Sequence, residues 1–276
     1  MSYLDRLKAI ANSMATEPPA GASTARKTLP PRVVQVGKSK AVAVPKRPEI
    51  QRFQKLRAWS YSVMSLWYEC PRAAKFRSID KVPTAGSAAM DRGTALHKQA
   101  ELYIGKDIPT LPKELAKIKD YLVRARNAKT EKFMEQEWGF TSGWEPTGWV
   151  SKDTWLRAKL DLAYMLDKKT MLVVDHKSGK VYPDHAKQRH LYATCVMARL
   201  PQVEKVIAQM WYIDIGPEPT AEQTSEFTRA EYADMVRYWN ARAQPMMNDD
   251  QYIPRPGSAC RFCAYAKSKQ GPCQYG

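Results

Sequence analysis

Residues 173–180 read Val-Val-Asp-His-Lys-Ser-Gly-Lys, the pattern of a buried strand that ends in charged side chains. Side chains alternate between faces along a strand, so we expect Asp175 and Lys177 on one face and His176 on the other. Asp161 lies on the preceding strand-like segment, and a polar Leu-Asp-Lys-Lys turn separates the two segments. This turn predicts a hairpin, in which Asp161 and Asp175 would approach each other closely.

The expected pairing of Asp161 with Asp175 has a chemical consequence. Two carboxylates in close contact repel each other unless a cation neutralises them, and oxygen ligands suit Mg²⁺ or Mn²⁺. Lys177 on the same face can then orient or deprotonate a water molecule, or stabilise the charge that develops on a phosphate. The three residues alone also fit a polar edge strand with a surface ion pair, so their context decides between the two interpretations.

The rest of the chain from residue 50 alternates between strand and helix patterns, which predicts an α/β unit over residues 50–276. A capping box at residues 228–231 and prolines such as Pro71 mark helix starts, and Ser62 is a candidate N-cap. We expect helices at 62–70, 88–103, 111–124, 184–200 and 228–247, and strands at 133–140, 155–165, 170–176 and 203–215.

The charge balance points to a polyanionic partner. The 276 residues contain 44 Lys and Arg against 28 Asp and Glu, a formal net charge of +16, which favours nucleic acid or an acidic membrane surface as partner. No apolar run approaches the roughly 18–20 residues that cross a bilayer, and charges interrupt the N-terminus, which argues against a secretory signal. We therefore expect a cytoplasmic protein, in the host cytoplasm if the chain is phage-encoded, that does not bind membranes.

Residues 1–49 differ in composition from the rest. They are rich in Pro, Ala, Lys and Arg, and residues 1–50 contribute +6 of the net charge. Composition predicts a basic, flexible leader. The spacing of Leu4, Leu7, Ile10 and Met14 also permits a short amphipathic helix over residues 3–14 that docks a partner or follows nucleic acid.

Further motifs surround the Asp161 and Asp175 segments in a fixed order. Gly93-Thr-Ala-Leu-His97 lies on an expected helix upstream, and Gln188 and Tyr192 lie one turn apart on the helix that follows Lys177. In this order the chain resembles the RecB-like branch of the PD-(D/E)XK nucleases, including its CRISPR-associated and phage-encoded stand-alone exonucleases. The resemblance covers roughly residues 58–276. It implies a restriction-endonuclease-like core, in which helices flank a mixed central sheet.

The resemblance also implies residue roles. The ion, Mg²⁺ or Mn²⁺, would be bound by His97, Asp161, Asp175 and the backbone carbonyl of His176. Family members often carry Tyr at the position of His176. Lys177 would position or activate the water, and Gln188 and Tyr192 would orient the active-site strand or the nucleic acid.

The expected reaction is hydrolysis of DNA phosphodiester bonds in recombination, repair or processing, with a helicase or recombination protein as partner. Exonuclease action on single strands or DNA ends is favoured, and endonuclease action is left open. Candidate phosphate-binding residues are Lys113, Lys117, Arg124, Lys187 and Arg189.

Two further points stay open at this level. The family often has a glutamate on the strand before the aspartate; Glu137 matches slightly better than Glu135, and either is equally well an exposed strand-edge charge. A catalytically silent module that binds nucleic acid or a partner protein on the same fold is the alternative function, against which the intact His97, Asp161, Asp175 and Lys177 argue.

Five cysteines complete the set of candidate ligands, and three of them lie in the last 17 residues. Cys260-x-x-Cys263 places two thiols on one turn, and Cys273 can fold back to them, which leaves a tetrahedral site in need of a fourth ligand. The resemblance implies that Cys70 is this ligand, because its Cys-Pro-Arg context is similar to that of the family's first cluster cysteine. The iron-sulfur members of the family hold a 4Fe-4S cluster with one upstream cysteine and three C-terminal ones, so the resemblance favours iron-sulfur, with zinc as the alternative. Cys195 is expected to be a buried apolar residue.

Overall fold

The computed structural model describes residues 55–216 and 223–276, all within the unit Phe53–Gly276. The predicted leader over residues 1–49 and its candidate helix at 3–14 lie outside the described residues. Within the described residues, no helix is both long enough and apolar enough to cross a membrane.

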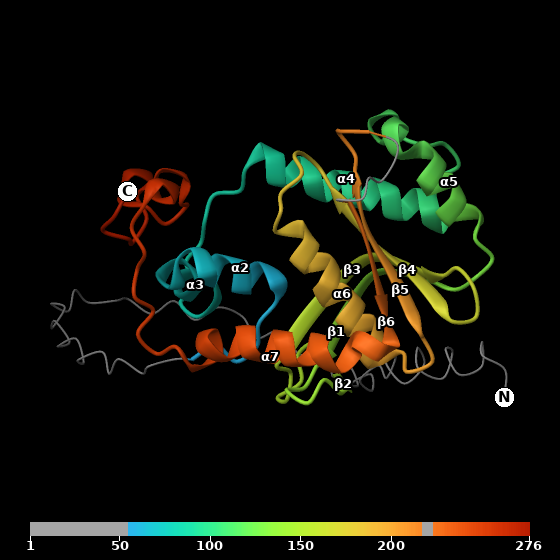
Figure 1. Ribbon diagram of the computed structural model, residues 1–276. Helices are drawn as coiled ribbons and strands as arrows, with labels where there is room; N and C mark the ends of the chain where they lie inside the picture. The colour runs from blue at the N-terminus through green and yellow to red at the C-terminus, as the bar shows by residue number, and fades with distance from the viewer. Residues whose placement is uncertain (1–54, 217–222) are drawn as a thin grey trace, which may run out of the picture. The chain divides into compact units, whose positions relative to one another are not determined.

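A six-stranded mixed sheet forms the centre of the unit (Figure 1). Its strands are β1 (Lys132–Phe140), β2 (Pro146–Thr147), β3 (Leu156–Met165), β4 (Thr170–Lys177), β5 (Lys205–Tyr212) and β6 (Thr224–Thr228), in the spatial order β2-β1-β3-β4-β5-β6. The pairs are antiparallel except β4 with β5, which are parallel. The expected hairpin of β3 and β4 is confirmed, with Leu162 opposite Val174.

Helices cover both faces of the sheet. They are α2 (Tyr61–Glu69), α3 (Pro71–Ser78), α4 (Ala88–Gly105), α5 (Lys119–Asn127), α6 (His185–Arg199) and α7 (Tyr232–Asn248), with short 3₁₀ turns between and after them. Helices α4 and α5 share a buried apolar cluster with Leu162, Val174 and Trp211 of the sheet. Helix α6 connects the parallel strands β4 and β5, packs against β5, β6 and β3, and is itself covered by α7 (Figure 1). The expected architecture of a mixed sheet flanked by helices is therefore confirmed.

Local signals explain where the helices begin. Helix α3 begins at Pro71, as expected, and Thr228 with Glu231 forms the expected capping box before α7. Helix α2 is capped by Ser60, whose hydroxyl accepts a hydrogen bond from the Val63 amide, so the candidate cap at Ser62 was wrong by two residues. Ser62 instead lies in the first turn of the helix. The short strands β2 and β6 were not predicted.

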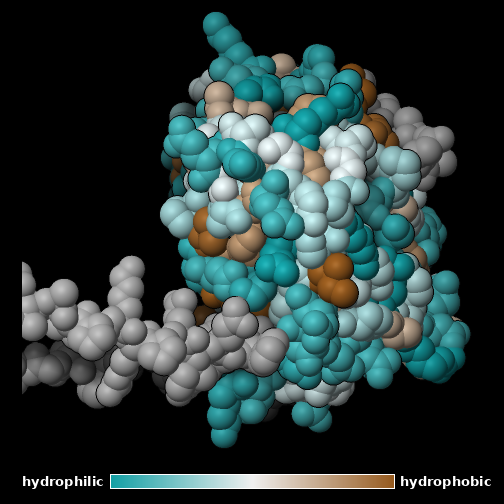
Figure 2. All heavy atoms as spheres, turned by 90° about the vertical axis from the view of Figure 1, so that its left-hand side faces the viewer, coloured by the Kyte–Doolittle hydropathy of each residue, from teal (hydrophilic) through white to brown (hydrophobic). Residues whose placement is uncertain are grey.

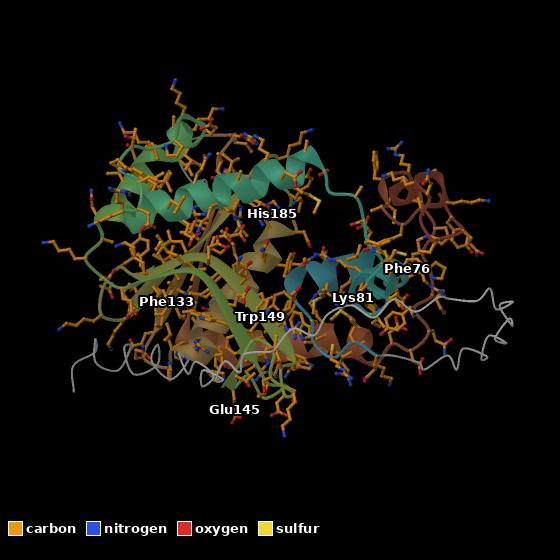
Figure 3. All side chains as sticks on the ribbon, turned by 180° about the vertical axis from the view of Figure 1, so that it is seen from behind. Phe76, Lys81, Phe133, Glu145, Trp149 and His185 are labelled. Carbon is orange, nitrogen blue, oxygen red and sulfur yellow. The ribbon has the colours of Figure 1, made fainter. Side chains whose placement is uncertain are left out.

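The C-terminal segment after α7 packs against α2 and α3. Phe76 on α3 contacts Tyr265, with ring centroids 5.5 Å apart, and Arg72 donates to the carbonyl of Tyr252 at 2.9 Å (Figure 3). Figure 2 shows this side of the molecule, where hydrophobic residues form small separate patches among hydrophilic ones. The packing brings the last cysteines next to Cys70 at the junction of α2 and α3.

Candidate metal centre and nucleic-acid cleft

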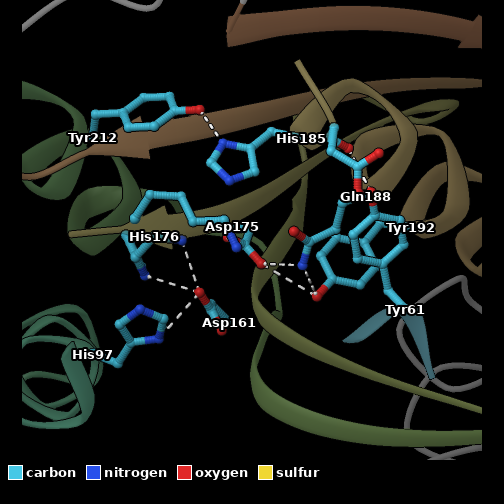
Figure 4. A network of polar contacts seen from close by, with 11 residues as sticks. Tyr61, His97, Asp161, Asp175, His176, His185, Gln188, Tyr192 and Tyr212 are labelled. Carbon is cyan, nitrogen blue, oxygen red and sulfur yellow. Dashed lines mark hydrogen bonds and ion pairs between the residues drawn. The ribbon is translucent and has the colours of Figure 1, made fainter. Parts of the chain in front are cut away.

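Asp175 is the best-connected carboxylate of the site. It lies near the end of the central strand β4 and its residue is only 4% exposed. One of its oxygens, Oδ1, accepts hydrogen bonds from the Gln188 amide at 2.9 Å and the Tyr192 hydroxyl at 3.2 Å (Figure 4). The Lys177 ammonium lies 2.7 Å from the other oxygen. The helix spacing of Gln188 and Tyr192 therefore serves to hold this one side chain.

Asp161 lies on β3 beside Asp175. Its Oδ2 accepts a hydrogen bond from the His176 backbone amide at 2.7 Å and lies 3.2 Å from Nδ1 of His97, which reaches it from α4 (Figure 4). Gly93 allows α4 to approach at this point, because a Cβ there would lie 3.3 Å from the Ser178 hydroxyl. The structure thus brings together the histidine and both aspartates that were predicted to form one site.

Burial and mutual interaction shift the pKa values of Asp161 and His97. Burial raises the pKa of Asp161, and the negative charge of Asp175 raises it further, against the opposing effect of His97. Burial lowers the pKa of His97, but its hydrogen bond to Asp161 and the charge of that residue outweigh burial, so the pKa of His97 is raised overall. Such a group binds a proton or another cation more tightly than an isolated carboxylate would.

His176 behaves differently from its neighbours. Its side chain packs against Trp211 and His97, with ring centroids 5.6 and 5.7 Å away, and its Nδ1 lies 3.7 Å from Oδ2 of Asp161 (Figure 4). Burial lowers the pKa of His176 to about 3, so its imidazole is neutral. The side chain therefore acts as a packing group, and the residue's backbone amide supports Asp161.

Glu135 was not among the predicted ligands, yet it completes a cluster. One atom each of His97, Glu135 and Asp161 lie within 4.8 Å of one another. Glu135 falls opposite Asp161 in the β1–β3 register, between the pairs Met134–Leu162 and Gln136–Leu160. Its backbone has φ of 51°, a strained value for a strand residue, and its carboxylate pairs with Lys159 at 2.7 Å. Glu137 sits two pairs further along, opposite Lys159, so the register favours Glu135 over Glu137 as the glutamate near Asp161.

The donor set of this cluster fits a divalent cation. Two carboxylates and one imidazole offer the oxygen-rich ligation that Mn²⁺ and Mg²⁺ take, and the imidazole favours Mn²⁺ of the two. Asp175 does not belong to the group of His97, Glu135 and Asp161. Its negative charge nevertheless raises the pKa of both His97 and Asp161. His97, Glu135 and Asp161 are therefore the residues that would hold the ion, with Asp175 next to it.

Two hollows meet at this centre. A main cleft of about 740 Å³ is lined by side chains that include Lys177, Gln188, Tyr192 and Trp149. A side pocket of about 500 Å³ is lined by His97 and Glu135 among others, and Lys159 belongs to both linings. The cationic residues of the main cleft are Arg77, Arg157, Lys159 and Lys177.

The five basic residues expected to contact phosphates line neither hollow. Arg189 is 4% exposed and donates to the Ser225 hydroxyl at 3.0 Å, so it is a buried structural residue and unsuited to a phosphate track. Lys187 pairs with Asp184, Lys117 donates to the Asp214 carbonyl, and Arg124 lies over the Tyr121 ring. Lys113 begins the 3₁₀ turn before α5. The sequence pattern identified basic residues on or near helices. The cationic side chains that line the main cleft come mainly from strands β3 and β4.

The four candidate cluster cysteines line one cavity. Cys70, Cys260, Cys263 and Cys273 all border a space of about 530 Å³ between α2–α3 and the C-terminal segment. Within residues 55–216 and 223–276, no three of their sulfurs lie within 4.8 Å of one another. A zinc ion at about 2.3 Å from each thiolate needs its four sulfurs only about 3.8 Å apart. A cluster in which each thiolate binds a different iron needs a wider spacing. Cys195 is fully buried, as expected.

A mixed sheet here positions two carboxylates and a lysine near the end of its central strand, and a flanking helix adds a histidine, an arrangement that could hold a divalent ion beside a basic side chain. The model of the PD-(D/E)XK nuclease superfamily matches residues 58–268, and the chain belongs to that superfamily. Among solved structures, the crystal structure of SSO0001 is similar, with 14% identity and a TM-score of 0.36 over 82% of this chain and 92% of that chain. A comparison with curated proteins gives no significant match.

Proposed function

We propose that this protein is a divalent-metal-dependent DNA exonuclease of the RecB-like, iron-sulfur branch, which acts on single strands or DNA ends. Asp161 and Asp175 on adjacent strands, with the Lys177 ammonium 2.7 Å from Asp175, carry this proposal. The net charge of +16 suits a nucleic-acid substrate. The proposed setting is cytoplasmic DNA recombination, repair or processing together with a helicase or recombination protein.

Each residue of the site has a role in this proposal. His97, Glu135 and Asp161 hold the Mg²⁺ or Mn²⁺ ion, with Asp175 and the backbone carbonyl of His176 beside it. When bound, such an ion lowers the pKa of a coordinated water and neutralises charge on a phosphate. Lys177 orients the attacking water or stabilises the charge that develops on the phosphate.

Gln188 and Tyr192 act on the site through Asp175. Both donate to the same oxygen, Oδ1, and therefore fix the rotamer of the carboxylate. The Gln188 amide also lies 2.8 Å from the Tyr192 hydroxyl, which links the two donors. We assign them as positioning residues of the active-site strand.

We also propose that Cys70, Cys260, Cys263 and Cys273 hold a 4Fe-4S cluster. The shared cavity of about 530 Å³ supports this assignment, because it is bordered by all four side chains. The family resemblance favours this cluster, and a single zinc ion bound by the same four thiolates is the alternative. The role of the cluster is structural, since it would join the C-terminal segment to α2 and α3.

The purified protein, incubated with end-labelled single-stranded and duplex DNA in Mg²⁺, in Mn²⁺ or in EDTA, tests the nuclease assignment. We expect progressive loss of the label from single strands or ends with either metal ion and no loss in EDTA. Equal digestion in EDTA would contradict the metal centre. Binding of DNA without any digestion would favour the catalytically silent alternative, and a circular single strand distinguishes exonuclease from endonuclease action.

A further inference from the structure

The main cleft contains aromatic side chains that the hydrolysis chemistry does not use, and Trp149 is the most informative. We propose that Trp149 is a base-stacking residue that selects single-stranded DNA for this cleft, an inference that rests on the proposed nuclease function. Trp149 lies in the loop between β2 and β3, is half-buried and lines the cleft together with Lys177 and Gln188 (Figure 3). A half-buried indole at the wall of a cationic cleft is the arrangement that proteins use to hold unpaired bases.

Arg157 fixes the indole in place. Its Nε donates to the Trp149 carbonyl at 2.8 Å, and its guanidinium carbon lies 5.6 Å from the centre of the indole ring. The backbone bond positions the loop, and the cation covers one face of the ring. A base then stacks on the remaining face, while the guanidinium stays near enough to interact with the adjoining phosphate.

A row of side chains leads from Trp149 to the metal centre. Arg157, Lys159 and Asp161 alternate along β3 and therefore share a face. Lys159 lines both the main cleft and the side pocket that is lined by His97, so the two hollows adjoin at this residue. The four residue steps from Arg157 to Asp161 span about 13 Å, a length that a few nucleotides of a single strand cover.

A second ring and the size of the cleft point to the same substrate. Tyr182, in the loop after β4, is 57% exposed and also lines the cleft. The volume of about 740 Å³ is that of a small-ligand site. It is enough for a few nucleotides. An unpaired strand offers both exposed base faces and backbone charge, whereas the base faces of a duplex are covered by stacking on one another.

Binding measured in EDTA separates this inference from catalysis. Fluorescence anisotropy of a labelled oligothymidylate gives the Kd of the wild type, Trp149→Ala, Trp149→Phe and the adjacent control Val150→Ala, whose side chain is 80% exposed and outside the cleft lining. We expect Trp149→Ala to weaken binding roughly 5- to 150-fold, the equivalent of one base–aromatic stack. Trp149→Phe should retain most of the affinity, and Val150→Ala should retain all of it.

A strand of the same length made of abasic sites is the second probe. The wild type should bind it at least as weakly as Trp149→Ala binds oligothymidylate, and the Trp149→Ala substitution should have no further effect on the affinity for the abasic strand. The inference is overturned if Trp149→Ala binds oligothymidylate with the wild-type affinity. It is also overturned if the substitution lowers the affinity for the abasic strand by the same factor as the affinity for oligothymidylate. Thermal unfolding of each variant shows that it is folded. Because no cleavage is needed, a protein that digests nothing but shows the base-dependent loss would refute the nuclease proposal alone.

Discussion

At the scale of single residues, the site depends on keeping two carboxylates close together inside the protein. Asp175 is held by Gln188, Tyr192 and Lys177, whereas Asp161 is held by His97 and one backbone amide. The partners of Asp175 include the Lys177 ammonium, whereas those of Asp161 include His97, whose imidazole can titrate near neutral pH. Substitutions therefore have separable effects on chemistry and on stability.

We expect Lys177→Ala to lower the cleavage rate by about 10²- to 10⁴-fold, because it removes the group proposed to orient the water or stabilise the phosphate. DNA affinity in EDTA should change little, since three other cations line the main cleft. Rates on end-labelled single strands and Kd values by anisotropy provide the measurement. Lys168→Ala, at an exposed position in the β3–β4 turn, is the matched control. Cleavage at the wild-type rate by Lys177→Ala would remove the catalytic assignment from this site.

The proton affinities of the site predict a pH dependence of the metal-free protein. The pKa of His97 is raised in the folded state, so its contribution to stability is present below the unfolded value of about 6.5 and is lost as pH rises through the folded pKa. Folding lowers the pKa of His176 to about 3. This residue therefore destabilises the folded protein only below about pH 6.5, where its imidazole is protonated in the unfolded chain. The free energy of unfolding in EDTA should therefore fall as the pH rises above about 6.5.

Urea unfolding of the metal-free protein between pH 6.5 and 8.5 measures this fall. His97→Gln should flatten the curve in this range because it removes the titrating group. A wild-type stability that is constant or rises with pH over the same range would contradict the proposed His97–Asp161 interaction.

Individual residues also mark where sequence reasoning ended. Period-two alternation on β3 and β4 was sufficient to place Asp161 beside Asp175, because both segments are long and apolar on one face. The choice between Glu135 and Glu137 depended on the register of β1 against β3, together with a positive φ at Glu135, and neither is encoded in a local pattern. Arg189 failed as a phosphate ligand because its helix α6 is packed on both sides.

At the scale of elements, strong local signals gave most of the fold. Proline at the start of α3 and the capping box before α7 correspond to observed elements. The single helix expected over residues 111–124 is instead a 3₁₀ turn (Lys113–Ile118) followed by α5. The strands β2 and β6 were missed because each is short and lies at an edge of the sheet, where pairing depends on the neighbouring strand. The cleft is built between elements, so helix-by-helix reasoning could not identify its lining.

The cysteine cavity connects elements that are about 190 residues apart in the chain. Metal–thiolate bonding on the order of 10 kcal/mol would offset the entropy of closing so long a loop. We expect Cys70→Ala and Cys263→Ala to lower the thermal midpoint by a similar amount, about 10 °C. Protein purified without oxygen should be brown and absorb broadly near 400 nm, as iron-sulfur clusters do.

Cys195→Ala is the control for this prediction, since Cys195 is buried on α6 and outside the cavity lining. It should retain the colour and the iron content. A colourless protein with one zinc ion per chain would refute iron but keep the shared site. A metal-free protein in which Cys70→Ala is as stable as the wild type would refute the shared site itself.

At the scale of the whole molecule, charge is the property that links the chain to its substrate. Residues 1–49 contain nine Lys or Arg and three Asp or Glu, so they contribute +6 of the net +16. Their removal leaves a protein of +10 in which the residues of the metal centre and the main cleft all lie within residues 58–268, the range of the family match. Binding of the whole chain and chemistry at the site should therefore respond differently to this truncation.

We expect deletion of residues 1–49 to weaken DNA binding at low salt and to make the dependence of log K on log salt shallower, because fewer counterions are released. The cleavage rate at saturating DNA should be unchanged, since the metal centre and Lys177 stay intact. A full-length variant with the nine Lys and Arg replaced by Gln separates charge from chain length and should behave like the deletion. If the deletion binds with the wild-type affinity and salt slope, these residues make no contact with the DNA backbone and their charge serves another partner.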